Sequence, residues 1–288
     1  MKHFIVLLRP HEYIKNLFIF LPLFFAFQIT DSVLLVKAAI AFVAFSLTAS
    51  GNYILNDYCD IEEDRRHPQK RSRPLASGTV EKSSALATMF LLFILGVGLM
   101  SACSRHAAGI LVIYALLNVF YSFYLRRIAI LDITVIAMGF VLRLWVGGAA
   151  TDIPLSMWII VLTFLLALFL ALAKRRDDVL FYLNTGQKTR KVIDGYNIRF
   201  LDGSMTIMAS VVIMSYILYT TSPYAIEKMH SEHLYLTVIF VIIGVLRYLQ
   251  ISLVEHNSGS PTQIAMKDRF IQITILGWIS LFTWIMYR

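Results

Sequence analysis

Charged residues and cysteines are both scarce in this sequence of 288 residues. Asp, Glu, Lys and Arg make up 15% of the chain, whereas a soluble domain has about 25%, and 58% of the residues are hydrophobic. The two cysteines, Cys59 and Cys103, have neither a disulfide pattern nor metal-ligand spacing. These absences argue against a soluble domain, a disulfide scaffold and a cysteine-based zinc site.

The hydrophobic residues are gathered into blocks of membrane-spanning length. A helix needs roughly 20 apolar residues to cross a hydrocarbon core of about 30 Å. Nine blocks qualify, at about 17–31, 34–55, 83–103, 107–125, 131–150, 155–173, 205–222, 233–253 and 270–287. The first has no small-residue cleavage site, so we expect it to be retained. The sequence predicts an all-α, polytopic membrane helix bundle with about nine transmembrane helices.

Positive charges are divided unevenly between the two sides of these spans. Of the 26 Lys and Arg residues, twenty fall on one side and four on the other. Because cytoplasmic loops carry the excess of Lys and Arg, the N-terminus is predicted to be cytoplasmic and the C-terminus outside. The net charge of +8 lies at the span ends, which is typical of contacts with lipid headgroups or phosphates and not with nucleic acid.

Acidic residues concentrate in the same places as the basic ones. The two longest loops, about 56–82 and 174–204, lie on the predicted cytoplasmic side and hold most of the Asp and Glu residues. Acidic residues contribute little to topology, so their position calls for another explanation.

The first of these loops carries three carboxylates at helical spacing. If the second span continues as a helix, Asp57, Asp60 and Asp64 stand on one face, with Asn56 one turn below Asp60. Three like charges on one helical face are destabilising unless a cation lies between them. Hard oxygen ligands of this kind suit Mg²⁺, which proteins share between carboxylates and substrate phosphates.

A basic stretch follows directly and ends at Pro74 and Gly78. It contains Arg65, Arg66, Lys70, Arg71 and Arg73. Arg offers paired donors to phosphate oxygens and Lys offers a compact positive charge. Carboxylates for a metal followed by cations for phosphates indicate a diphosphate site. The alternative is a solvated loop whose charges pair with one another and with lipid headgroups.

Other polar residues lie at membrane depth or at its edge. An ionisable residue inside a span is expensive, so Asp132 and Arg143 are functional candidates, although helix-dipole stabilisation and a structural ion pair would also explain them. Tyr121 and Tyr124 are candidates that could equally be interfacial belt residues. The run from Lys174 to Asp178 indicates a second phosphate or metal station, or a basic stop signal.

These residues carry a family resemblance. The string N-D-x-x-D-x-x-x-D (Asn56 to Asp64) resembles the first aspartate-rich motif of the UbiA superfamily of intramembrane prenyltransferases, and the tyrosines before Arg126, followed by Asp132, are similar to a second pattern of that superfamily. Within it, the chain is most similar to the decaprenyl-phosphate phosphoribosyltransferase branch. The supporting strings are R-P-x-x-x-x-K-N (Arg9 to Asn16), H-P-x-K-R-x-R-P-x-A-x-G (His67 to Gly78), A-K-R (Ala173 to Arg175), Arg190-Lys191, Arg247-Tyr248 and Asp268-Arg269.

The resemblance implies a single UbiA-like transmembrane domain over residues 1–288, with the loops at about 56–82 and 174–204 forming the cap of an active site. It implies a Mg²⁺ cofactor, a donor (5-phosphoribosyl 1-diphosphate) and an acceptor (a polyprenyl phosphate of decaprenyl or undecaprenyl type). The product would serve cell wall biosynthesis in a bacterial inner membrane, with the active site facing the cytoplasm. The oligomeric state, including a homo-oligomer, is left open.

Carried onto this chain, the resemblance assigns metal binding and catalysis to Asp57, Asp60 and Asp64, and a catalytic role to Asp132. It assigns substrate binding to Lys15, Asn56, Lys70, Arg71, Arg73, Tyr121, Tyr124, Arg126, Arg143, Lys174, Arg175 and Lys191. The second station departs from the family's D-x-x-x-D pattern and is more basic, which suits a donor with an additional 5-phosphate.

Three interpretations compete at this stage. The first is transfer of phosphoribose to a polyprenyl phosphate, favoured by the basic stretch that ends at Gly78. The second is transfer of a prenyl group from a prenyl diphosphate to an aromatic or other small acceptor. The third is a transporter, which is disfavoured because transporters place polar residues near the bilayer midplane, whereas the charges here cluster at one interface.

Overall fold

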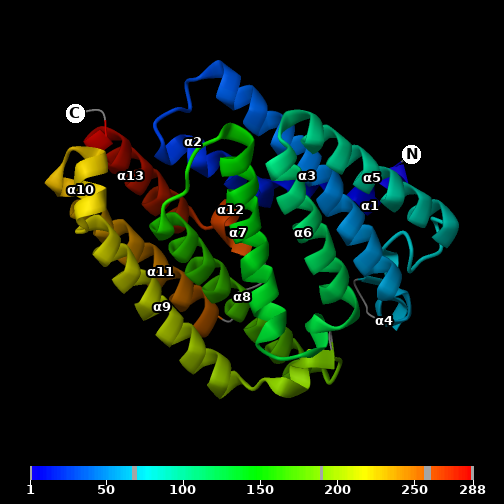
Figure 1. Ribbon diagram of the computed structural model, residues 1–288. Helices are drawn as coiled ribbons and strands as arrows, with labels where there is room; N and C mark the ends of the chain where they lie inside the picture. The colour runs from blue at the N-terminus through cyan, green and yellow to red at the C-terminus, as the bar shows by residue number, and fades with distance from the viewer. Residues whose placement is uncertain (1, 67–69, 189–190, 256–260, 287–288) are drawn as a thin grey trace. The chain divides into compact units, whose positions relative to one another are not determined.

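Helices make up all the regular structure of the described chain (Figure 1). A computed structural model describes residues 2–66, 70–188, 191–255 and 261–286, and these ranges contain α-helices and 3₁₀-helices with no strand. The predicted all-α class is therefore confirmed. The chain divides into two compact units, Met1–Ile160 and Val161–Arg288, which are described separately below.

The first unit contains seven α-helices and three 3₁₀-helices among its described residues. They are α1 (Lys2–Leu8), η1 (Pro10–Phe20), α2 (Leu21–Phe25), α3 (Ser32–Cys59), α4 (Ile61–Arg66), η2 (Lys70–Ser72), α5 (Lys82–Cys103), α6 (Arg105–Phe123), η3 (Leu125–Arg127) and α7 (Leu131–Thr151). The long helix α3 packs against α5, α6, α7 and η1, so it is the central element of this unit.

The second unit begins within α8 (Met157–Thr185). Its other elements are η4 (Lys191–Gly195), α9 (Ile198–Thr220), α10 (Pro223–Met229), η5 (Glu232–Thr237), α11 (Val238–Leu253), α12 (Pro261–Lys267) and α13 (Arg269–Met286). Here α11 packs against α9 and α13.

Eight helices within the described ranges are long and apolar enough to cross a membrane. They are Ser32–Cys59, Lys82–Cys103, Arg105–Phe123, Leu131–Thr151, Met157–Thr185, Ile198–Thr220, Glu232–Leu253 and Arg269–Met286. Each overlaps one of the last eight spans predicted from the sequence. The first predicted span, 17–31, is different, because it falls on the end of η1, on α2 and on the turn before α3.

The segment formed by Arg9 and η1 nevertheless runs alongside α3 in the opposite direction. Four contacts join this segment to α3 in antiparallel order: Arg9 with Asp57, Tyr13 with Ser50, Asn16 with Ser46 and Phe20 with Phe42. A 3₁₀-helix rises about 2.0 Å per residue, so positions 9–20 extend about 22 Å, and positions 42–57 of α3 extend about the same at 1.5 Å per residue. The 3₁₀ geometry of η1 therefore lets this segment match the length of α3 beside it with fewer residues.

Small residues allow this close packing. The buried core of the first unit joins Ile19 of η1 to Phe45 of α3, Tyr114 of α6 and a series of alanines. A side chain at Gly147 of α7 would put its Cβ only 2.2 Å from the carbonyl oxygen of Ile19. Small residues at helix contacts are typical of membrane proteins, where backbones approach closely to gain packing contacts.

We expect Gly147→Ala to destabilise the protein by about 1–3 kcal/mol, because the new methyl group meets backbone and not a flexible side chain. Gly98→Ala in α5 is the matched control, since no atom lies within 4 Å of its added Cβ. That control should instead gain up to about 1 kcal/mol from the lost backbone freedom of glycine. Thermal unfolding in detergent compares the two. Equal midpoints would contradict the close approach of α7 to η1.

Candidate active site

The three predicted carboxylates lie where α3 passes into α4. Asp60 joins the two helices, and the backbone bonds from Asp60 N to Asn56 O (3.1 Å) and from Asp64 N to Asp60 O (2.8 Å) carry the helical pattern across the junction. Asp57 and Asp64 are 2% and 3% exposed, and Asp60 is half-buried. The expected single helix is interrupted, because α3 ends at Cys59, Asp60 follows it and Asp64 lies in α4, but the helical spacing of the three carboxylates is kept across the junction.

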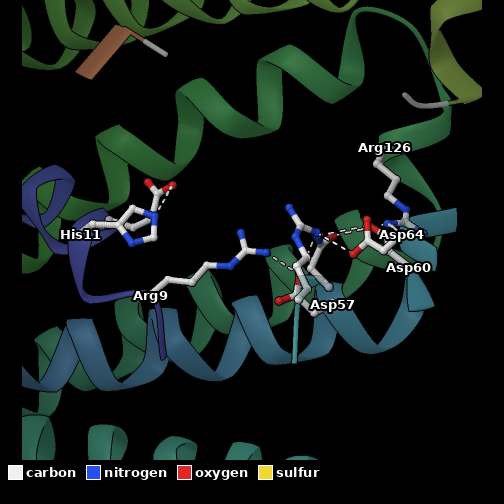
Figure 2. A network of polar contacts seen from close by, with 9 residues as sticks. Arg9, His11, Asp57, Asp60, Asp64 and Arg126 are labelled. Atoms are coloured by element: carbon white, nitrogen blue, oxygen red, sulfur yellow. Dashed lines mark hydrogen bonds and ion pairs between the residues drawn. The ribbon is translucent and has the colours of Figure 1, made fainter. Parts of the chain in front are cut away.

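Arginines from three separate segments meet these carboxylates (Figure 2). Arg9, between α1 and η1, pairs with Asp57, and Arg126 of η3 pairs with Asp60. Arg73 bridges two of the carboxylates, since its Nη1 donates to Asp57 Oδ1 at 3.0 Å and to Asp64 Oδ2 at 2.7 Å. We call these three carboxylates and three arginines the acid–arginine cluster.

The cluster compensates the charges that the helix brings together. Three carboxylates within two turns repel one another, and buried charges require paired partners. The nitrogen of Arg73 shared by Asp57 and Asp64 marks a position where these carboxylates accept a cation. Within the described residues, no three side chains of His, Cys, Asp or Glu converge closely enough to hold a metal ion by themselves.

A compact turn fixes the position of Arg73. The carbonyl oxygen of Arg73 accepts from the backbone N–H of Ser77 (2.9 Å), and that of Pro74 accepts from Val80 (3.1 Å). Gly78 adopts a φ of +77°, which glycine reaches without strain. The proline and glycine that end the basic stretch therefore form the turn that holds Arg73.

The other predicted residues of the basic stretch lie in η2. Lys70 is half-buried and Arg71 is exposed. Asn56 donates to Asp60 Oδ2 at 3.3 Å and accepts from Arg126 at 3.3 Å, so it belongs beside the cluster. Lys15 pairs with its neighbour Glu12.

Arg143 of α7 is buried, and only 5% of it is exposed. Its Nε donates to Asn16 Oδ1 (2.9 Å), its Nη1 to the carbonyl oxygen of Gly139 (2.7 Å), and its Nη2 to the Tyr114 hydroxyl (3.4 Å). Aromatic rings of Phe45, Tyr114 and Phe140 lie 4.9–5.3 Å from the guanidinium carbon. Cation–π contacts and neutral acceptors thus stabilise this charge, and no carboxylate of the described chain touches it.

The remaining candidates of the first unit differ in exposure. Asp132, in the first turn of α7, is fully buried and lies two residues after Ile130, which has a φ of 72°. Tyr121 is half-buried, and Tyr124 is 67% exposed at the end of α6. This exposure of Tyr124 fits the interfacial role that the sequence left open.

In the second unit, the basic run lies inside α8 and not in a loop. Arg175 donates to Asp178 (2.6 Å), while Arg176 donates to Asp202 of α9 (2.5 Å) and to the carbonyl oxygen of Ser252 in α11 (2.6 Å). Lys174 is exposed. Lys191 begins η4, and its side chain lies outside the described part of the structure.

Another ion-pair group lies near the end of α11. Arg247 donates to Asp268 Oδ2 at 2.7 Å and to Glu255 Oε1 at 2.7 Å. The Arg247 guanidinium holds the pKa of the Asp268 carboxyl below its usual value. Such a pair at the surface is a structural tie that joins α11 to the segment before α13.

Sequence reasoning missed three residues that the structure makes prominent. Arg9 appeared only in the R-P string, although it pairs with Asp57 across 48 positions. Arg176 joins three helices, and Asn52 is buried one turn before Asn56 with neither amide atom hydrogen-bonded to any described residue. The helical spacing of Asn52, Asn56 and Asp60 was the available signal for the last.

We expect Arg73→Gln to lower stability by about 2 kcal/mol, because it leaves Asp57 and Asp64 without their shared cation. The figure lies below the ~3–5 kcal/mol typical of a fully buried pair, since the Arg73 side chain is 26% exposed. Lys188→Gln is the control, because Lys188 forms an exposed ion pair with Asp194. Thermal unfolding in detergent, with and without Mg²⁺, tests both. Mg²⁺ should recover more stability in Arg73→Gln than in the control, and equal recovery would contradict a cation position there.

The amino-acid chain matches a known protein family. The model of the UbiA prenyltransferase family matches residues 17–284. The chain is 32% identical to the decaprenyl-phosphate phosphoribosyltransferase of Mycolicibacterium smegmatis, covering 94% of this chain and 88% of that one. It is 31% identical to the enzyme of the same name from Corynebacterium glutamicum, covering 94% and 83%.

Solved structures share the fold at lower identity. A UbiA homologue from Archaeoglobus fulgidus bound to GPP and Mg²⁺ superposes with a TM-score of 0.73 at 17% identity, covering 99% of this chain and 100% of that one. A digeranylgeranylglyceryl phosphate synthase structure gives a TM-score of 0.67 at 19% identity. With a family match over nearly the whole chain and relatives above 30% identity, the chain belongs to the UbiA prenyltransferase family.

Proposed function

We propose that this membrane protein transfers 5-phosphoribose from 5-phosphoribosyl 1-diphosphate to a polyprenyl phosphate, in a Mg²⁺-dependent reaction that releases diphosphate. Two relatives named decaprenyl-phosphate phosphoribosyltransferase align over more than nine-tenths of this chain, which supports a transferase acting on a polyprenyl phosphate. The observation that carries the proposal is the acid–arginine cluster at the end of α3, where metal-binding oxygens and phosphate-binding cations meet.

The donor set of the cluster fits a magnesium ion. Carboxylate oxygens of Asp57, Asp60 and Asp64 are hard ligands, and Mg²⁺ in such sites completes its coordination with water and substrate phosphates. Asp57 and Asp64 already share a cationic nitrogen, so a positive charge is accepted between them. Bound Mg²⁺ would supply positive charge to the donor diphosphate.

The residues of the cluster would act on the departing diphosphate. The bond from ribose C1 to the diphosphate oxygen breaks with its electron pair on the diphosphate, and an oxygen of the acceptor phosphate forms the new bond to C1. Arg73 and Arg126, with Lys70 and Arg71 nearby, bind the leaving group as its charge grows. Because the acceptor phosphate is already anionic, no general base is needed. The apolar spans keep water from the reactive carbon.

Roles for the other residues remain proposals. We assign to Asp132 the binding of a sugar hydroxyl or of a second metal ion. The residues assigned to orient the substrates are Lys15, Asn56, Tyr121, Tyr124, Arg143, Lys174, Arg175 and Lys191. Arg143 is the weakest of these, because its guanidinium is already bonded to Asn16, Gly139 and Tyr114.

We further place the cluster on the cytoplasmic side of a bacterial inner membrane, where a soluble phosphorylated donor is available. The excess of Lys and Arg on that side supports this orientation. The antiparallel run of η1 along α3 is consistent with a ninth crossing at the N-terminus, which preserves the predicted topology.

The assay uses purified protein with Mg²⁺, labelled 5-phosphoribosyl 1-diphosphate and a polyprenyl phosphate. We expect the label to enter an organic-extractable lipid, and chelation of Mg²⁺ should abolish the transfer. If the label stays aqueous, while a labelled prenyl diphosphate is consumed with an aromatic acceptor, prenyl transfer replaces the proposal.

Asp57→Asn and Asp60→Asn should each lower magnesium-dependent transfer by at least about 100-fold, in line with the loss of one preorganised charge. Glu62→Gln is the matched control, because Glu62 lies on the same stretch but is exposed and pairs with Arg65. Size-exclusion chromatography and thermal unfolding verify that the variants fold. Full turnover by both Asp variants would exclude this cluster as the active site.

A further inference from the structure

Asn52 of the first unit has a buried amide, and both polar atoms of this amide are without a hydrogen bond to the described residues. Asn52 lies in α3 and is 5% exposed, and neither its Oδ1 nor its Nδ2 is hydrogen-bonded to any residue of the described ranges. The other fully buried asparagine of this unit, Asn16, is bonded on both sides, donating to Ser46 (2.9 Å) and accepting from Arg143 (2.9 Å). The fold therefore satisfies one buried amide and leaves the other open.

An open amide at this depth is costly. An unsatisfied buried polar group destabilises a protein, and within a membrane no bulk water is present to compensate. The amide of Asn52 offers two N–H donors and one carbonyl acceptor. A group that both donates and accepts hydrogen bonds, such as a hydroxyl, matches it.

The position of Asn52 relates it to the acid–arginine cluster. Asn52 and Asn56 stand at i and i+4 of α3, and Asp60, at i+8, is the residue that caps its end, so the three follow one side of the helix. Asn56 and Asp60 both contact Arg126. Asn52 lies one turn farther into the span, about 6 Å along the helix axis from Asn56. Asn52 is thus one helical turn farther into the span than Asn56, which lies beside the cluster that the proposed function assigns to the diphosphate.

We propose that Asn52 binds a hydroxyl group of the donor's ribose ring, an inference that rests on the proposed function. The ribose is joined directly to the diphosphate, and its C1 must face the apolar spans to be shielded from water. The first polar side chain on that path along this face of α3 is Asn52. A sugar hydroxyl satisfies its amide, whereas a prenyl chain in the same place would leave it buried and unpaired.

This contact makes Asn52 a specificity-determining residue. A site built to hydrogen-bond a hydroxyl discriminates strongly against an analogue that lacks one, because the buried partner is then left unsatisfied. An amide at this position favours a pentosyl donor over a prenyl diphosphate, although both present the same diphosphate to the cluster.

The test compares Asn52→Leu with Asn16→Leu, two exchanges of amide for an apolar group of similar size. Asn52→Leu should fold with unchanged or higher thermal stability, since no hydrogen bond within the protein is lost, whereas Asn16→Leu should melt earlier. In the transfer assay, Asn52→Leu should raise the KM for 5-phosphoribosyl 1-diphosphate about tenfold, the loss expected of one or two hydrogen bonds. The KM for the polyprenyl phosphate should not change.

Donors lacking the 2-hydroxyl or the 3-hydroxyl identify the contact. With the unaltered protein, one of these analogues should have a kcat/KM about tenfold lower than the natural donor. With Asn52→Leu, that analogue and the natural donor should react equally well, because their shared partner is gone. The comparison among donors within the unaltered protein does not depend on the folding of any variant.

Three outcomes overturn the inference. The first is that both deoxy donors react as fast as the natural one with the unaltered protein. The second is that Asn52→Leu retains the full discrimination between donors. The third is a KM increase for the polyprenyl phosphate alone. Absence of any transfer from 5-phosphoribosyl 1-diphosphate by the unaltered protein refutes the proposed function instead, so the two failures are distinguishable.

Discussion

The structure of the first unit depends on the charge balance at the end of α3. Asp57, Asp60 and Asp64 lie within about two helical turns across the junction of α3 and α4, and Asp57 and Asp64 are almost completely buried. Such carboxylates are tolerated only with cations beside them. The cations come from Arg9, Arg73 and Arg126, which lie in three separate segments of the chain. Pairing with α3 thereby ties the N-terminal segment, the turn after η2 and the link between α6 and α7 to one point.

Sequence patterns predicted the helices and the carboxylates because both signals are local. Hydropathy identifies apolar stretches of spanning length, and helical spacing places the three carboxylates together. Hydropathy does not distinguish a 3₁₀-helix from an α-helix, so it did not predict how η1 follows α3. The partners of the carboxylates were also beyond reach, because the pairs Arg9–Asp57 and Arg126–Asp60 join residues 48 and 66 positions apart. Only the tertiary packing decides which of many arginines takes each place.

Arg143 and Asn52 differ in how far the described residues satisfy a buried polar side chain. Arg143 looked functional in the sequence because a charge inside a span is expensive. In the structure, the buried charge of Arg143 is stabilised by Asn16, a backbone carbonyl, a tyrosine hydroxyl and three aromatic rings. Asn52 attracted no notice as a neutral residue, yet neither polar atom of its buried amide is hydrogen-bonded to a described residue. To identify a candidate binding residue, an unsatisfied hydrogen-bonding group is therefore more informative than the position of a polar residue inside a span.

The charge balance also bears on how a doubly phosphorylated sugar is held. Three carboxylates and three arginines leave the acid–arginine cluster neutral, so a metal ion with a diphosphate adds little net charge to it. A 5-phosphate adds negative charge that the cluster does not compensate, and it requires cations outside it. Lys70 and Arg71 belong to η2, which precedes Arg73 in the chain, and the Arg71 side chain is exposed. A prenyl diphosphate has no second phosphate group for these additional cations, so the basic stretch is better matched to the doubly phosphorylated sugar of the proposed function.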